Sequence, residues 1–166
     1  MKRCPILLCV FALALLAGSL GSGCSKKEKK LKELVEVSAV RLFNIRNLAI
    51  ACIKYEYAHE EDRIPNSLQD VKAYMPDGTI PESPGKPEDF DGPSYILVQP
   101  LAGKKFGQFS PSHKYVIVYE NPAFCTVEIN VGFLDGHYMK MTLPAFRQAL
   151  EDTYKLLGLP MPEPAP

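Results

Sequence analysis

The chain has 166 residues, with 19 basic and 19 acidic side chains and so no formal net charge at neutral pH. Such a balanced chain lacks the basic excess that nucleic-acid-binding proteins need, and we expect no nucleic-acid partner. The length allows one domain that buries a real core.

The first 23 residues have the pattern of an export signal. Lys2 and Arg3 precede an uncharged apolar run over residues 6–17, and small residues follow up to Cys24. The run is shorter than the about 20 apolar residues of a permanent membrane-spanning helix. We therefore expect residues 1–23 to act as a signal peptide. Its removal would leave 17 basic and 19 acidic residues, since both of its charged residues are basic.

The residues Leu20-Gly21-Ser22-Gly23-Cys24 resemble the lipobox of bacterial lipoproteins, whose cysteine is diacylated and becomes the mature N-terminus. The resemblance implies a lipid anchor on Cys24 and a place in the cell envelope, facing the periplasm or the exterior. Gly21 stands where that motif usually has an aliphatic residue, so an ordinary signal sequence is the alternative. Each buried CH₂ contributes about 0.8 kcal/mol, and two acyl chains would hold the protein stably.

Two cysteines, Cys52 and Cys125, remain for the folded domain. In an oxidising compartment they can form one disulfide. The other interpretation is two separately buried thiols that behave as small apolar residues. The sequence leaves both open.

A long helix is predicted from Lys26 to about His59, because this segment has no glycine or proline and its apolar residues recur at helical spacing. We expect residues 24–38 to be a lipid-anchored charged spacer that includes the helix start. Asn66 or Ser67 can cap a second, short helix that runs to about Tyr74. The five prolines between positions 76 and 93 predict a loop that packs over the domain.

Three segments have the β-branched and aromatic composition of strands, at 94–99, 115–119 and 126–134, and the pattern resumes at 137–141. Asp135-Gly136-His137 lies between the last two. Asp-Gly between such runs is a strong hairpin signal and favours a type I′ turn, in which both central residues have positive φ.

Thr142, followed by Pro144, predicts the start of an amphipathic helix over 143–157, and Gly158 predicts its end. Residues 159–166 form a proline-rich tail that we expect to be disordered. The predicted fold is α+β, with a long N-terminal helix packed on a small antiparallel sheet, a C-terminal helix, and the helices on one side of the sheet. The globular domain would cover residues 39–158.

Several segments taken together resemble the globular part of pseudopilin-like proteins, which are relatives of the type II secretion major pseudopilin. The resemblance covers roughly residues 40–150, and its segments are 45–55, 63–68, 93–95, 119–122 and 133–137. It implies a structural or interaction role. Members of that family keep an apolar N-terminal helix that polymerises, whereas this chain has Cys24 and a lysine-rich spacer there. We therefore expect a pseudopilin-like domain moved onto a lipid anchor.

The histidines and cysteines do not form a catalytic or metal-binding motif. His59, His113 and His137 lack the paired spacing of metal ligands, and nothing around Cys125 resembles the segment of a cysteine nucleophile. We expect no enzyme activity, no metal site and no cofactor. The acidic loop that contains Glu82, Glu88, Asp89 and Asp91 can supply oxygen ligands for calcium, although its spacing is not that of an EF-hand.

The sequence thus predicts a membrane-anchored, non-catalytic envelope lipoprotein, a structural or protein-interaction component with partners in the envelope or a secretion system. The alternative is a periplasmic lipoprotein that binds a small ligand or calcium and uses the loop 76–93 as one wall of its site. A deep cleft with converging polar groups would favour the second interpretation.

Overall fold

The computed structural model describes residues 26–162, so the predicted signal peptide and Cys24 lie outside the described residues. Its internal contacts divide the chain into two units, residues 1–35 and residues 36–166. The architecture below is that of the second unit. None of the helices in the described part has the length and hydropathy of a membrane span.

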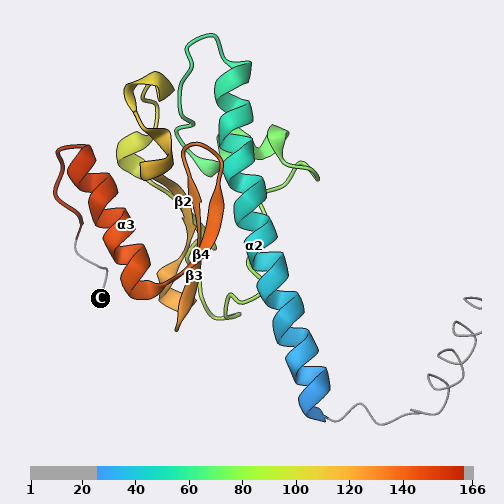
Figure 1. Cartoon of the computed structure of the whole chain (residues 1–166). Coiled ribbons are helices and arrows are strands. Elements are labelled where there is room, and N and C mark those ends of the chain that lie inside the picture. Colours follow the sequence, from blue (N-terminus) through green and yellow to red (C-terminus); the bar gives the residue numbers. More distant parts are fainter. Residues whose placement is uncertain (1–25, 163–166) are drawn as a thin grey trace, which may run out of the picture. The chain divides into compact units, whose positions relative to one another are not determined.

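Helix α2 runs from Lys26 to Ala58 and confirms the predicted long helix (Figure 1). From residue 41 onward its inward face carries Ile45, Leu48, Ala49 and Cys52, all of them buried. Their spacing of three and four residues puts them on one stripe of the helix. The side chains of residues 26–36 are exposed.

The sheet is an antiparallel meander in the order β1-β2-β3-β4. Its strands are β1 (Tyr95–Leu97), β2 (Val116–Glu120), β3 (Glu128–Phe133) and β4 (Tyr138–Thr142). All four predicted strands are therefore present. Strand β1 is shorter than predicted because the chain turns at once into a 3₁₀ helix, Gln99–Leu101, with a proline in its first turn.

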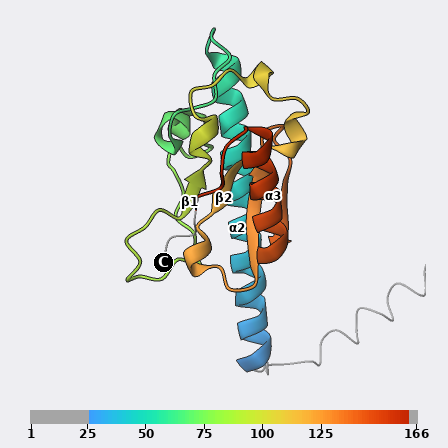
Figure 2. The same ribbon diagram turned by 90° about the vertical axis from the view of Figure 1, so that its left-hand side faces the viewer.

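The helices cover opposite faces of the sheet, which corrects the expectation that they share one side (Figures 1 and 2). On one face, Gly132 of β3 lies against Ala49 and Ile45 of α2. On the other, the ring of Tyr119 packs on Phe146 of helix α3 (Leu143–Leu156), with 4.9 Å between the ring centroids. The sheet is thus the middle layer of three.

Helix α3 begins and ends as predicted. The Thr142 hydroxyl accepts a hydrogen bond from the Ala145 N–H, and Gly158 has a φ of +68° just after the helix. The expectation of a disordered tail from residue 159 is wrong at its start. The Leu159 N–H donates to the Tyr154 carbonyl, and Met161 packs against the core.

The second predicted helix is a 3₁₀ helix, Leu68–Tyr74. The backbone N–H groups of Asn66 and Ser67 both donate to the Asp70 carboxylate at 2.9 Å. A side chain from inside the helix thus accepts the hydrogen bonds of the backbone N–H groups at its start. The following loop has neither helix nor strand and is tied to the domain through buried Ser83 and Ser94, as the predicted packing required.

Candidate functional site

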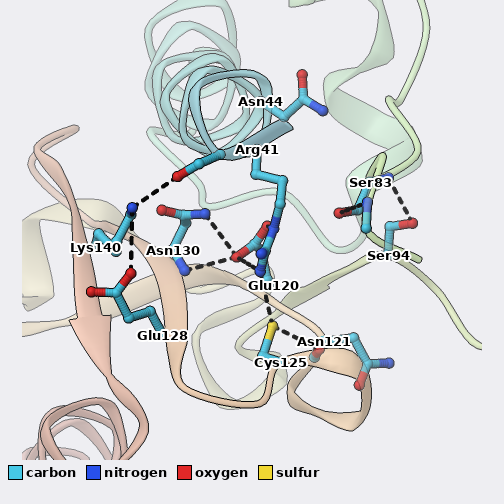
Figure 3. A network of polar contacts seen from close by, with 12 residues as sticks. Arg41, Asn44, Ser83, Ser94, Glu120, Asn121, Cys125, Glu128, Asn130 and Lys140 are labelled. Atoms are coloured by element: carbon cyan, nitrogen blue, oxygen red, sulfur yellow. Dashed lines mark hydrogen bonds and ion pairs between the residues drawn. The ribbon is translucent and has the colours of Figure 1, made fainter. Parts of the chain in front are cut away.

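A buried ion pair joins helix α2 to the sheet (Figure 3). Glu120, the last residue of β2, is fully buried, and Arg41 reaches it from α2. Arg41 Nε lies 2.8 Å from Oε1 and Nη2 lies 2.9 Å from Oε2, so the guanidinium binds both carboxylate oxygens. Burial lowers the pKa of Arg41, but the hydrogen bonds and charge of Glu120 raise it overall.

Asn130 of β3 completes the surroundings of the carboxylate. Its backbone N–H and its side-chain Nδ2 each donate to Glu120 Oε2 at 2.8 Å. Glu120 therefore accepts four hydrogen bonds, which compensates for the loss of water around a buried charge. Its role is to join α2, β2 and β3.

Asn130 itself is not fully satisfied. Its Oδ1 is the only buried side-chain nitrogen or oxygen without a hydrogen-bond partner among the described residues. Asn130 and Lys140 are direct partners across β3 and β4, and Figure 3 shows Oδ1 on the side of the lysine. The Lys140 ammonium binds Ser38 of α2 at 2.8 Å and Glu128 at 3.4 Å. Ser38 belongs to the predicted spacer, so the packed part of α2 begins slightly before residue 39.

Cys125 belongs to the same cluster. Arg41 Nη2 lies 3.2 Å from its sulfur, and the thiol donates to the Asn121 carbonyl at 3.4 Å. Burial and the nearby charge of Glu120 raise the pKa of Cys125 to about 11. Because the thiolate is the nucleophilic form, a thiol with this pKa is unreactive near neutral pH.

Both candidate disulfide cysteines are buried and free. Cys125 lies beside Arg41, while Cys52 is eleven residues further along α2, a rise of about 16 Å. A disulfide needs Cα atoms within about 7 Å. The structure therefore has the arrangement of the second interpretation, with two separate thiols in the core.

The acidic loop is held by internal contacts. Glu82 accepts a short hydrogen bond from Ser94 and pairs with Lys86 at 3.2 Å. The Ser94 bond is the main cause that lowers the pKa of Glu82. Within residues 26–162, no group of three or more His, Cys, Asp or Glu side chains is placed to hold a metal ion.

Asp135-Gly136-His137 forms the predicted hairpin, but not with the predicted turn. Gly136 has a φ of +86°, whereas Asp135 is not among the described residues with positive φ. The Gly136 N–H donates to the Phe133 carbonyl, and the Phe133 N–H donates to the His137 carbonyl. The connection is thus a three-residue loop whose last residue is left-handed, in place of a type I′ turn.

The side chains of this hairpin stabilise the turn. The Asp135 carboxylate accepts hydrogen bonds from the backbone and the ring of His137. Burial raises the pKa of Asp135, but these bonds lower it overall. The His137 ring stacks on Phe133 with 4.0 Å between centroids. Asp135, Gly136 and His137 therefore all contribute to the turn.

No family model matches the chain, and no curated protein or solved structure is significantly similar to it.

Proposed function

We propose that this protein is a lipid-anchored, non-catalytic component of the bacterial cell envelope whose globular domain binds another envelope protein. The anchor half of the proposal rests on the sequence before the described part. A short apolar run ends in small residues at Cys24, and charged residues follow directly. Acylation of Cys24 would place residues 36–166 outside the cytoplasm.

The binding half rests on the outward face of α2. Val40, Phe43, half-buried Ile50 and Tyr57 recur there at spacings of three and seven residues, on the side away from the buried stripe. Val40 is 47% exposed, Phe43 51% and Tyr57 81%. Large apolar side chains aligned on one exposed helix face mark a surface for a partner. This stripe is the observation that carries the proposed interaction.

The chemistry of the buried groups supports a non-catalytic role. The fully buried carboxylate of Glu120 accepts hydrogen bonds from Arg41 and Asn130, and burial raises the pKa of the Cys125 thiol. The resemblance to pseudopilin-like proteins favours the same role, because those proteins assemble with other proteins. The relationship to that family remains a prediction.

Acylation is tested by intact mass and membrane fractionation of the full chain expressed in a bacterium. The wild type should begin at Cys24, carry added acyl mass and sediment with membranes. Cys24→Ala should lose the acyl mass and leave the membrane fraction or accumulate as precursor. Cys9→Ala is the matched control, since it removes a cysteine from the leader without touching Gly23-Cys24. An unacylated wild type would refute the anchor.

The binding face is tested by site-specific photocrosslinking in the native envelope. A crosslinker at Phe43 should give a discrete adduct, and the second substitution Val40→Glu should abolish it. A crosslinker at the exposed Arg147 of α3 is the control. Equal adducts at both positions, or an adduct that tolerates Val40→Glu, would argue against the α2 face as the contact surface.

A further inference from the structure

Two cations stand directly opposite each other beside the C-terminal end of α3. Arg63 and Lys105 are partners in an isolated antiparallel bridge, so their side chains leave the backbone on the same side. Backbone hydrogen bonds of 2.9 Å between Ile64 and residues 103 and 104 hold this short ladder in place. Like charges at directly opposed positions destabilise a pair of strands. The arrangement therefore favours a negative charge between them.

The protein itself compensates only part of this charge. Arg63 Nη1 donates to the Gly103 carbonyl at 2.8 Å, and Nε pairs with Glu61. Lys104 and Lys105 are exposed, and in the part of the chain that the structure describes neither has a carboxylate partner. Two lysines and one edge of the guanidinium thus remain available to an anion.

These cations line an open cleft of about 520 Å³, a volume in the usual range of small-molecule sites. Phe109 and Tyr115 form its aromatic part, both at least 90% buried and packed edge to face with 5.2 Å between centroids. Leu156 and Leu157 line it from the end of α3. In Figure 1 the yellow segment that carries residues 104–109 lies next to the red end of α3.

The C-terminal end of α3 carries about half a negative charge from the helix dipole, which the three full positive charges of the cleft exceed. Some of its last carbonyls are satisfied within the chain, because the Leu157 N–H donates to the Thr153 carbonyl and the Gly158 N–H to that of Lys155. A second cleft shares Leu156 with the first and is lined by Lys114, Ala149, Asp152, Lys155 and Leu156. Its two lysines exceed its one carboxylate, so it adds a single net positive charge to the surroundings.

We propose that this cleft binds a small organic anion, a carboxylate or phosphate group carried on an apolar or aromatic body. The anionic group would lie between Arg63, Lys104 and Lys105, and the body would cover Phe109, Tyr115 and Leu156. The apolar lining distinguishes the site from a bare phosphate site, and the opposed cations distinguish it from a site for neutral ligands. Binding here does not depend on acylation or on the outward face of α2.

The test is calorimetry and amide-shift NMR on the full chain in an uncharged maltoside detergent. The probes are phenyl phosphate, benzoate, inorganic phosphate and phenol. Phenyl phosphate or benzoate should bind and shift the amides of Gly103, Phe109 and Leu157. Whichever binds more tightly assigns the site to phosphate or to carboxylate. Inorganic phosphate and phenol should each bind at least tenfold more weakly.

The double variant Lys104→Gln/Lys105→Gln should weaken binding of the preferred probe at least tenfold, because neither side chain makes an ion pair in the described chain. Lys54→Gln/Lys72→Gln removes the same charge elsewhere and should stay within twofold of the wild type. Unchanged amide dispersion would show that both variants are folded. Phenol or inorganic phosphate binding as tightly as phenyl phosphate, equal losses in the two variants, or no binding of either organic anion would overturn the proposal.

Discussion

At the scale of single residues, the stability of the domain depends on the buried carboxylate of Glu120. An unpaired buried carboxylate costs several kcal/mol, and Glu120 avoids that cost through four hydrogen bonds from Arg41 and Asn130. Removing one partner of such a pair is costly because the other charge stays buried without compensation. Stability should therefore respond strongly at this position.

We predict that Glu120→Gln lowers the free energy of unfolding by about 3 kcal/mol, toward the lower end for a buried pair, because Arg41 keeps some contact with solvent. Urea unfolding followed by circular dichroism measures this loss. Arg41→Met should cost a similar amount, and the double variant should cost less than the two losses added. Full additivity would show that the two residues do not act as a pair.

Glu128→Gln is the matched control for this prediction. Glu128 pairs with Lys140 at 3.4 Å, but its side chain is 51% exposed. Exposed pairs contribute at most about 1 kcal/mol, so this loss should stay well below that at Glu120. Similar losses at the two carboxylates would contradict the special role of the buried pair.

The sequence contains a signal for the pair of Arg41 and Glu120. Arg41 falls on the same helix stripe as Ile45, Leu48 and Cys52, and Glu120 directly follows a run of strand residues. A charged residue in line with a buried stripe indicates a buried partner. The identity of that partner depends on how α2 packs across the sheet. Local spacing along the sequence does not determine this packing. The sequence therefore leaves Cys125 as a disulfide partner or a separately buried thiol and does not predict its contact with Arg41.

At the scale of elements, the contact between α2 and β3 depends on a missing side chain. A Cβ on Gly132 would lie 2.9 Å from Ala49 Cβ and 3.0 Å from Val118 Cγ1. Gly132→Ala should therefore cost about 1–3 kcal/mol of unfolding free energy, the usual range for an overpacked core. Thermal unfolding measures the cost. Adding Ala49→Gly should recover part of it, although glycine inside a helix itself costs about 1 kcal/mol.

Gly107→Ala serves as the control for overpacking. No atom lies within 4 Å of a Cβ at that position, and the glycine does not have positive φ. The change should alter stability by less than about 0.5 kcal/mol, as most surface substitutions do. A loss as large as that at Gly132 would remove the steric explanation.

The short ladder at Arg63 gives a prediction of opposite sign. Lys105→Glu replaces a like-charged cross-strand pair with an oppositely charged one, so the protein should gain about 0.2–1 kcal/mol in unfolding free energy. Chemical denaturation at low salt measures the gain, and high salt should reduce it. The same substitution should weaken organic anion binding. Destabilisation would show that the two side chains do not face each other.

At the scale of the whole molecule, the order and type of elements could be predicted, while the number of layers could not. Helical spacing, strand composition and the Asp135-Gly136 signal gave α2, the four strands and α3. In residues 127–133, apolar side chains alternate with Glu128, Asn130 and Gly132, a pattern typical of a strand with one solvent-facing side. Asn130 and Gly132 both face α2 in the structure. Asn130 donates a hydrogen bond to Glu120, and Gly132 allows close packing against Ala49. Because the buried contacts on this face use polar and small residues, the sequence pattern does not indicate that a helix covers it.

The ionisable side chains of buried Cys52 and Tyr95 and of half-buried Tyr119 predict how stability changes with pH. Burial raises the pKa of Cys52 from 9.0 to about 12, and that of Tyr95 and Tyr119 from 10.0 to about 12. Between the lower pKa of each group in the unfolded chain and its higher pKa in the folded protein, the folded protein keeps a proton that the unfolded chain has lost. The unfolding free energy should therefore be constant for these groups below pH 9 and fall as the pH rises toward 12, by about 1.4 kcal/mol per pH unit for each group within its window.

Urea midpoints between pH 8 and 11 test this dependence. Cys52→Ala should lower stability at pH 8 because it leaves a small cavity, but its decline above pH 9 should be less steep than that of the wild type. Tyr57→Phe, at an exposed position of α2, should leave the slope unchanged. A wild-type profile that stays flat to pH 11 would mean that these groups ionise without opening the core, which is incompatible with their burial between α2, the sheet and α3.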